Sequence, residues 1–368
     1  MFRGHSTRGC ALARKPFRRL SDQAENAIPA EILCQSIHIG DLKGDRTEML
    51  WAGDAVYYLH SADSASAEIE EGFALGLGSV FAQLMPPRGV VDATARIEHF
   101  AAVVATLKRR FGSRLFLIVD PQGLCMQPDL RWGMVADDGQ IDPELTLCTL
   151  YAAAYELAKA GIDAFVTIGR MNCEVEVARA ALDASRPDVE LYAFSTNSET
   201  PIAYFDATAF NPDRAITGQK ILVGNTTEMI LRACMDVDEG IGVMIQKPLE
   251  NIAVLSTLRQ LGNGTASLDA FLDSASAQRL MNDNIDIHPW DRLRTLGFRE
   301  KLRALKLGAY EVSGTFCIAR AIEKLYGTEL AWAVYQETLS NVVAACGGRP
   351  RWIIGRTMQW FVKNAPTR

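Results

Sequence analysis

The sequence predicts an eight-stranded β/α barrel (a TIM barrel), and three observations favour this fold. Short, almost wholly apolar segments recur along the chain, and a longer segment with helical spacing of apolar residues follows each one. Continuous apolar runs are typical of parallel strands buried on both faces, and their alternation with helices predicts an α/β architecture. The glycine-rich turn that a doubly wound open sheet carries after its first strand is missing, because the GLGSV stretch (76–80) precedes a predicted strand.

The elements follow in a regular order along the chain. The predicted strands are 55–60, 79–84, 115–120, 164–169, 191–195, 242–246, 308–312 and 352–355. The predicted helices are 64–76, 93–110, 143–160, 174–184, 226–237, 250–261, 315–325 and 329–346. Basic residues end the second of these helices and a proline begins the third, and both placements favour a helix. We therefore expect the barrel to span residues 51–368.

Two segments lie outside this alternation. Residues 1–50 are predicted to form an N-terminal arm, which is rich in arginine and lysine over its first twenty positions. Residues 262–307 are too long for a simple connection before the seventh strand. They are predicted to form a helical insertion in two pieces, broken at His288-Pro289. The insertion could be a lid over the barrel, a subdomain or an oligomer contact.

Composition and charge narrow the class of protein. The net charge is -6 and the pI is about 5.5, whereas nucleic-acid-binding domains usually have a basic face. The chain has no run of about 20 apolar residues, so we expect no membrane-spanning helix. The eight cysteines are scattered without close pairs, which is typical of a reduced, cytoplasmic protein. The five histidines are isolated from one another, so no local motif indicates a metal site.

Functional residues of a β/α barrel lie at the C-terminal ends of its strands. Lys247 follows the predicted strand 242–246, Asp120 ends another, and Ser313 follows 308–312. Burial can lower the pKa of a lysine there, and the neutral amine can form a Schiff base with a ketone. From position alone, Lys247 could equally be a surface residue or be paired with Asp120. Ser313 could bind a carboxylate or cap the following helix.

Several segments, in the same order, resemble the porphobilinogen synthase (5-aminolevulinate dehydratase) family. GAYEVSGTFCIAR (308–320) resembles the family signature, and MIQKP (244–248) resembles the segment with the principal Schiff-base lysine. YAFSTNSETPIAYF (192–205) resembles the segment with the second lysine. LIVDPQGLC (117–125), LYAAAYELAKAGIDAF (150–165) and NTTEMI (225–230) also match in order. The resemblance implies an imine on Lys247, with Asp120 and Ser313 in the same site.

The sequence also departs from the family pattern. The second Schiff-base lysine of the family falls on Asn197, and an asparagine cannot form an imine. The three zinc cysteines of the family would fall on or near Gln122, Leu124 and Trp132, so we predict no metal cofactor. A standard condensation through two imines is therefore not expected.

Together, the matches and departures predict a metal-independent Schiff-base lyase or condensing enzyme that acts on a keto acid or amino-keto acid through Lys247. It would work in specialised metabolism of pyrroles or other nitrogen compounds and not in standard haem synthesis. The predicted catalytic residues are Lys247 and Asp120. The predicted substrate-binding residues are Ser313, Asn197, Ser195, Lys220, Arg170, Glu311, Phe316 and Arg356.

Two alternatives stay open. The chain could be a non-catalytic homologue that acts as a binding or scaffold protein, or an authentic porphobilinogen synthase that uses a single imine. We predict a small-molecule substrate and neither a nucleic-acid nor a membrane partner. The basic arm resembles the arms with which family members wrap neighbouring barrels, which implies a homo-oligomer from dimer to octamer.

Overall fold

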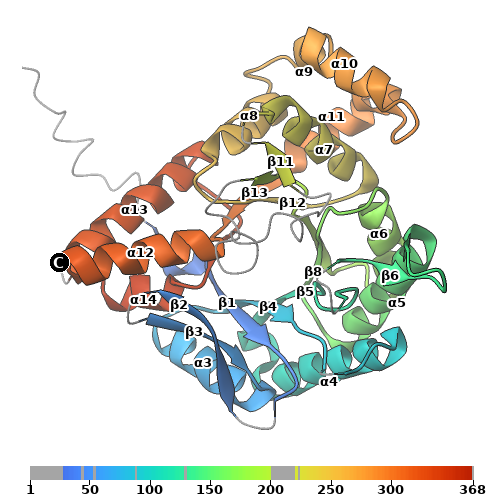
Figure 1. The fold of residues 1–368 in the computed structure, drawn as a ribbon. Helices are drawn as coiled ribbons and strands as arrows, with labels where there is room; N and C mark the ends of the chain where they lie inside the picture. The colour runs from blue at the N-terminus through green and yellow to red at the C-terminus, as the bar shows by residue number, and fades with distance from the viewer. Residues whose placement is uncertain are drawn as a thin grey trace, which may run out of the picture.

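The computed structural model describes residues 28–42, 45–52, 55–87, 89–127, 131–199, 220–222 and 224–366. Within these residues, eight parallel strands form a closed barrel with helices around it (Figure 1). The barrel strands, in order, are β1 (Leu33–Ile39), β4 (Ser79–Leu84), β5 (Phe116–Asp120), β8 (Ala164–Thr167), β9 (Glu190–Ala193), β12 (Val243–Gln246), β13 (Lys306–Tyr310) and β14 (Ile353–Gly355). Pairing of β14 with β1 closes the ring, so the predicted TIM barrel is confirmed.

Helices on the outside of the ring follow the strands. They are α3 (Ala62–Ala74), α4 (Ala93–Phe111), α5 (Pro143–Ala160), α6 (Glu174–Ser185), α7 (Thr226–Glu239), α8 (Ile252–Gly262), α12 (Ser313–Tyr326), α13 (Thr328–Ala345) and α14 (Met358–Lys363). Local sequence sets several of their ends. The side chains of Asp92 and Asp142 accept hydrogen bonds from the first turns of α4 and α5. Gly161 adopts the left-handed conformation that ends α5.

The first barrel strand is not the one that the sequence predicted. Residues 55–60 form β3 (Ala55–His60), which pairs antiparallel with β2 (Arg46–Ala52) and extends the sheet beside β1. Strand β1 supplies the first barrel position, although it falls inside the arm expected over 1–50. The prediction failed because polar residues interrupt the apolar run of β1, whereas the run of β3 is nearly continuous. Residues 1–27 of the expected arm lie outside the described residues.

Side chains of the barrel strands alternate between the interior and the helix layer. Every second residue of a strand points to the same face. One buried cluster fills the barrel interior and takes two or more residues from several strands, for example Tyr192 and Phe194 around β9. The larger cluster lies between strands and helices and includes Leu117 and Val119 of β5. The alternation therefore fixes which strand-end side chains reach the interior.

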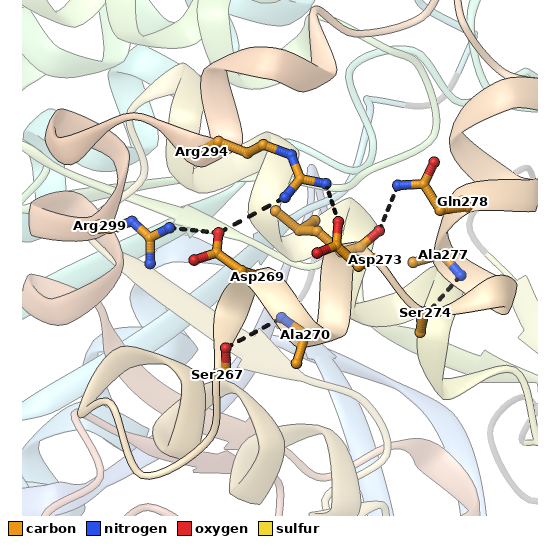
Figure 2. Close-up of polar contacts among 10 residues, drawn as sticks. Ser267, Asp269, Ala270, Asp273, Ser274, Ala277, Gln278, Arg294 and Arg299 are labelled. Carbon is orange, nitrogen blue, oxygen red and sulfur yellow. Dashed lines mark hydrogen bonds and ion pairs between the residues drawn. The ribbon is translucent and has the colours of Figure 1, made fainter.

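The insertion before β13 is helical, and its predicted break at His288-Pro289 is confirmed. It contains α9 (Leu268–Leu272), α10 (Ala275–Asp283), a 3₁₀ helix η4 (Trp290–Arg294) and α11 (Leu296–Ala304). Figure 2 shows how ion pairs connect its pieces. Asp269 of α9 lies 2.6 Å from Arg299 and 3.8 Å from Arg294, and Arg294 also contacts Asp273 at 2.7 Å. Ser267 and Ser274 cap the two short helices.

The insertion packs on the outer wall of the barrel. Helix α8 starts just after the C-terminal end of β12, so it leads away from the barrel mouth, and the insertion begins where α8 ends. Helix α10 and η4 pack against α7, and Figure 1 shows α9 and α10 outside the ring of helices. Of the three interpretations of the insertion (a lid, a subdomain or an oligomer contact), its position thus argues against a lid over the barrel mouth. None of the helices in the described ranges is long and apolar enough to cross a membrane.

Candidate active site

Lys247 follows β12 at the C-terminal end of the barrel and is almost completely buried, with 7% of its surface exposed. Its ammonium nitrogen lies 3.8 Å from the centre of the Phe194 ring and 5.1 Å from that of Tyr310. Phe81 packs against both of these rings. Burial in this aromatic environment lowers the pKa of Lys247 to about 7, although the carboxylate of Asp120 opposes the shift. A large fraction of the amine is therefore neutral near neutral pH.

Asp120 ends β5 in the same interior and is 1% exposed. Burial raises the pKa of its carboxyl, and the charge of Lys247 is the main opposing influence. One carboxylate oxygen accepts the backbone N–H of Gln122 at 2.8 Å, and the other accepts Nε2 of Gln83 at 3.3 Å. The Gln83 carbonyl in turn accepts the hydroxyl of Tyr310 at 2.9 Å. A hydrogen-bonded chain thus runs from Asp120 to the ring beside Lys247.

Two arginines add positive charge near the lysine. Arg170 follows β8 and lies over the Trp132 ring, 5.3 Å from its centre. Arg356 follows β14 and lies 5.0 Å from the Tyr57 ring centre and 5.7 Å from that of Tyr310. Both charges help to lower the pKa of Lys247. A guanidinium group binds a carboxylate with two parallel hydrogen bonds, so either arginine can hold an acidic group of a substrate.

The loop that carries Arg170 is fixed by Glu174, the first residue of α6. Its buried carboxylate accepts the backbone N–H groups of residues 168–171 at 2.6 to 2.9 Å. Gly169 in this loop has a φ of +74°, and a Cβ atom there would lie 2.5 Å from the Cα of Ser195. Tight packing and the internal carboxylate therefore determine where Arg170 is placed.

Asn197 and Lys247 are neighbours through their backbones. Asn197 begins β10 (Asn197–Glu199), which pairs in parallel with β11 (Lys220–Leu222) and bridges to Lys247. The backbone N–H of Lys247 donates to the carbonyl of Thr196 at 3.1 Å. The backbone of Lys220 is thus placed opposite Asn197, while its side chain is outside what the structure describes. Ser313 begins α12 and is buried.

Three predicted substrate-binding side chains make contacts within the protein. The hydroxyl of Ser195 donates to Asp236 of α7, in the helix layer. The carboxylate of Glu311 accepts the hydroxyl and N–H of Thr357 at 2.8 and 3.0 Å, and also the N–H of Arg356. Phe316 of α12 packs against Tyr57, with 6.1 Å between ring centres. Substrate contacts for these residues stay predictions.

Two polar residues at the barrel mouth, His38 of β1 and Gln83 of β4, were not among the predicted site residues. Strand register pairs His38 with Gln83 and Gln83 with Asp120, so the three form one row across neighbouring strands. Gln83 lies near the end of the predicted strand 79–84, and the strand-end rule could have found it. His38 was not predicted because its strand falls inside the arm expected over residues 1–50.

The residues at the positions of the family's zinc cysteines do not form a zinc site. Leu124 is a core side chain, and the Trp132 indole donates to the carbonyl of Gln122 at 3.0 Å. Cys125 is buried, which raises the pKa of its thiol to about 12 and disfavours the thiolate that binds zinc. Among the described residues, no group of three or more His, Cys, Asp or Glu side chains could hold a metal ion. That no metal is needed stays a prediction.

Comparison with known proteins identifies the family. The model of the delta-aminolevulinic acid dehydratase family matches residues 11–265, more than half of the chain. The chain belongs to this family. The resemblance found in the sequence is thereby confirmed, and the family's enzymes are lyases.

Two relatives support the assignment. A delta-aminolevulinic acid dehydratase from Halalkalibacterium halodurans is 28% identical over 275 residues, which cover 70% of this chain and 81% of that protein. The porphobilinogen synthase of Toxoplasma gondii ME49, solved with its reaction product porphobilinogen, has a similar structure. The TM-score is 0.71 at 16% identity, over 96% of this chain and 91% of that chain. At this identity the structural likeness supports the fold alone.

Proposed function

We propose that this member of the delta-aminolevulinic acid dehydratase family is a Schiff-base lyase or condensing enzyme that acts on a keto acid or amino-keto acid. The observation that carries the proposal is Lys247, a buried lysine with a pKa of about 7 at the barrel mouth, beside Asp120. A neutral amine is a nucleophile toward a ketone, whereas an ammonium group is not.

The chemistry follows from this arrangement. The amine of Lys247 adds to the ketone carbon and gives a carbinolamine. Asp120, whose pKa is raised by burial, supplies the proton with which the hydroxyl leaves as water. The product is an iminium ion on Lys247, which withdraws electrons from the neighbouring carbons. Arg170 and Arg356 bind the substrate's carboxylate.

Asn197 separates this reaction from a condensation through two imines. It lies beside Lys247, where the resemblance to the family puts a second lysine, and an amide nitrogen cannot form an imine. We therefore propose that one substrate is held covalently, without a metal, and that the enzyme serves specialised nitrogen metabolism instead of standard haem synthesis. We further propose that it acts in the cytoplasm as a homo-oligomer joined through its N-terminal arm.

Borohydride trapping tests the proposal. The protein is incubated with 5-aminolevulinate or with 4-oxopentanoate, reduced with sodium borohydride, and analysed by peptide mass spectrometry. We expect a reduced adduct on Lys247 and none in Lys247→Met, which keeps the aliphatic side chain but lacks the amine. Lys324→Met, at an exposed position on α12, is the matched control and should label like the unaltered protein. Absence of any adduct would contradict imine chemistry and favour a binding or scaffold role.

A further inference from the structure

His38 lies on the interior face of β1, in a row with two residues of the proposed active site. His38 is four residues from Cys34, so the two side chains point to the same face of β1, and Cys34 belongs to the interior cluster. Its register partner is Gln83, and the register partner of Gln83 is Asp120. Neighbouring strands are about 4.8 Å apart, so His38 is two strands from Asp120 at the same level of the barrel.

The hydrogen bonds around Tyr57 favour one tautomer of His38. The Tyr57 hydroxyl lies 3.0 Å from the backbone carbonyl oxygen of Ser36 and 2.9 Å from Nδ1 of His38. A carbonyl oxygen can only accept, so the single hydroxyl proton points to Ser36. The hydroxyl oxygen then accepts a hydrogen bond from Nδ1–H of His38. The favoured tautomer of His38 thus has its proton on Nδ1, and its Nε2 carries a lone pair.

The surroundings also keep this ring neutral. His38 is 7% exposed, and burial disfavours its charged form. The charges of Arg356 and His60 add to this effect and hold the pKa of His38 well below its usual range. The interior thus contains an uncharged imidazole whose Nε2 can accept a proton.

We propose that Nε2 of His38 is the proton acceptor for the carbon next to the iminium carbon of the substrate. The inference rests on the proposed imine at Lys247. The proton moves from that carbon to Nε2 and gives an imidazolium. The C–H electron pair becomes the C=C bond, and the C=N π pair moves to the lysine nitrogen, so the iminium becomes a neutral enamine. The nucleophilic carbon of the enamine can then attack a second substrate.

The other carboxyl groups nearby suit this role less well. Both oxygens of the Glu311 carboxylate already accept hydrogen bonds, from the N–H and hydroxyl of Thr357 and from the backbone N–H of Arg356. Burial raises the pKa of Asp120, which suits it to donate a proton in carbinolamine dehydration. A buried acid and a neutral imidazole in one row give the site separate groups for donating and accepting a proton.

Deuterium uptake separates proton removal from imine formation. The protein is incubated with 4-oxopentanoate in D₂O, and deuterium at the carbons next to the ketone is followed by NMR, with a protein-free sample for the background. Borohydride trapping on the same samples measures the imine. We expect His38→Gln to retain the Lys247 adduct and to lose at least about a hundredfold in deuterium uptake, which is the scale of general base catalysis. Tyr57→Phe, which removes the hydroxyl that favours this tautomer, should give intermediate uptake.

His99→Gln is the control. His99 is a half-buried histidine of α4, in the helix layer outside the ring of barrel strands. Its uptake should equal that of the unaltered protein. Uptake in His38→Gln within twofold of the unaltered protein would overturn the inference, as would an adduct without any uptake in the unaltered protein. If no adduct forms at all, the proposed imine itself fails, and the role of His38 with it.

Discussion

At the residue scale, Lys247 and Asp120 lie in one interior where burial disfavours the charged form of each. Each charge also stabilises the other, and the two arginines act on the lysine in the opposite direction. The pKa of Lys247 is therefore set by its surroundings and not by its residue type alone. This balance predicts how the reaction with a ketone should depend on pH.

The rate of imine formation should rise with pH and reach half of its maximum at about pH 7, because only the neutral amine attacks the ketone. Asp120→Asn removes a charge that raises the pKa of Lys247, so the midpoint should move to lower pH. Arg170→Gln removes a charge that lowers this pKa, so the midpoint should move to higher pH. Borohydride labelling, stopped at set times and repeated at a series of pH values, measures the midpoint for the unaltered protein and for both variants. Midpoints that move in the same direction would contradict this electrostatic account.

At the element scale, strand ends and the loops that follow them place the reactive groups. The loop after β8 is held by one carboxylate, since Oε2 of Glu174 accepts the amides of residues 168 and 169 and Oε1 accepts those of 170 and 171. The loop after β14 is similarly held by Glu311. Arg170 and Arg356 are thus positioned by buried glutamates.

Glu174→Gln should destabilise the protein and loosen Arg170. The amide nitrogen that replaces one oxygen cannot accept a hydrogen bond, so two buried backbone N–H groups lose their partner. Bonds to charged groups are worth about 2 kcal/mol each, and a loss of about that size or more should lower the urea midpoint. Glu176→Gln, at an exposed position in the same helical turn, should leave the midpoint unchanged. Equal midpoints for the two variants would show that the Glu174 carboxylate does not support the loop.

At the scale of the whole molecule, the insertion and the barrel meet around Asp238 near the end of α7. Asp238 is buried and lies 2.9 Å from Arg292 and 3.6 Å from His288 of the insertion. At Asp238 the insertion therefore joins the outer wall of the barrel and not the strand end that carries Lys247. This arrangement predicts that the insertion can be loosened without loss of the active site.

Asp238→Asn should speed up cleavage by trypsin within the insertion, because the loss of charge weakens its contact with Arg292. The borohydride adduct on Lys247 should form as in the unaltered protein. Asp286→Asn, an exposed position within the insertion, is the control and should be cleaved at the unaltered rate. Simultaneous loss of the adduct in Asp238→Asn would indicate that the insertion supports the barrel mouth.

The amino-acid sequence by itself determined most of the barrel. Seven of the predicted strands lie in the barrel among the described residues, because parallel strands buried on both faces need apolar side chains at nearly every position. Lys247 and Asp120 could be predicted as catalytic residues from the sequence because strand ends converge in a barrel, and because the flanking segments resemble a known family. Strand β1 was missed because polar residues such as Ser36 and His38 face the interior and interrupt its apolar run.

Only the tertiary structure decided which of these side chains meet. Ser195 and Glu311 lie at or near the ends of predicted strands, as Lys247 does. In the structure, however, their side chains bond to Asp236 and to Thr357. His38 and Asp120 are far apart in the chain and come into one row through strand register, which no local pattern encodes. The pKa of Lys247 depends on the same three-dimensional facts, since burial and the distances to other charges set it. The sequence thus specified most of the barrel, and the packing of its interior set the electrostatic surroundings of Lys247.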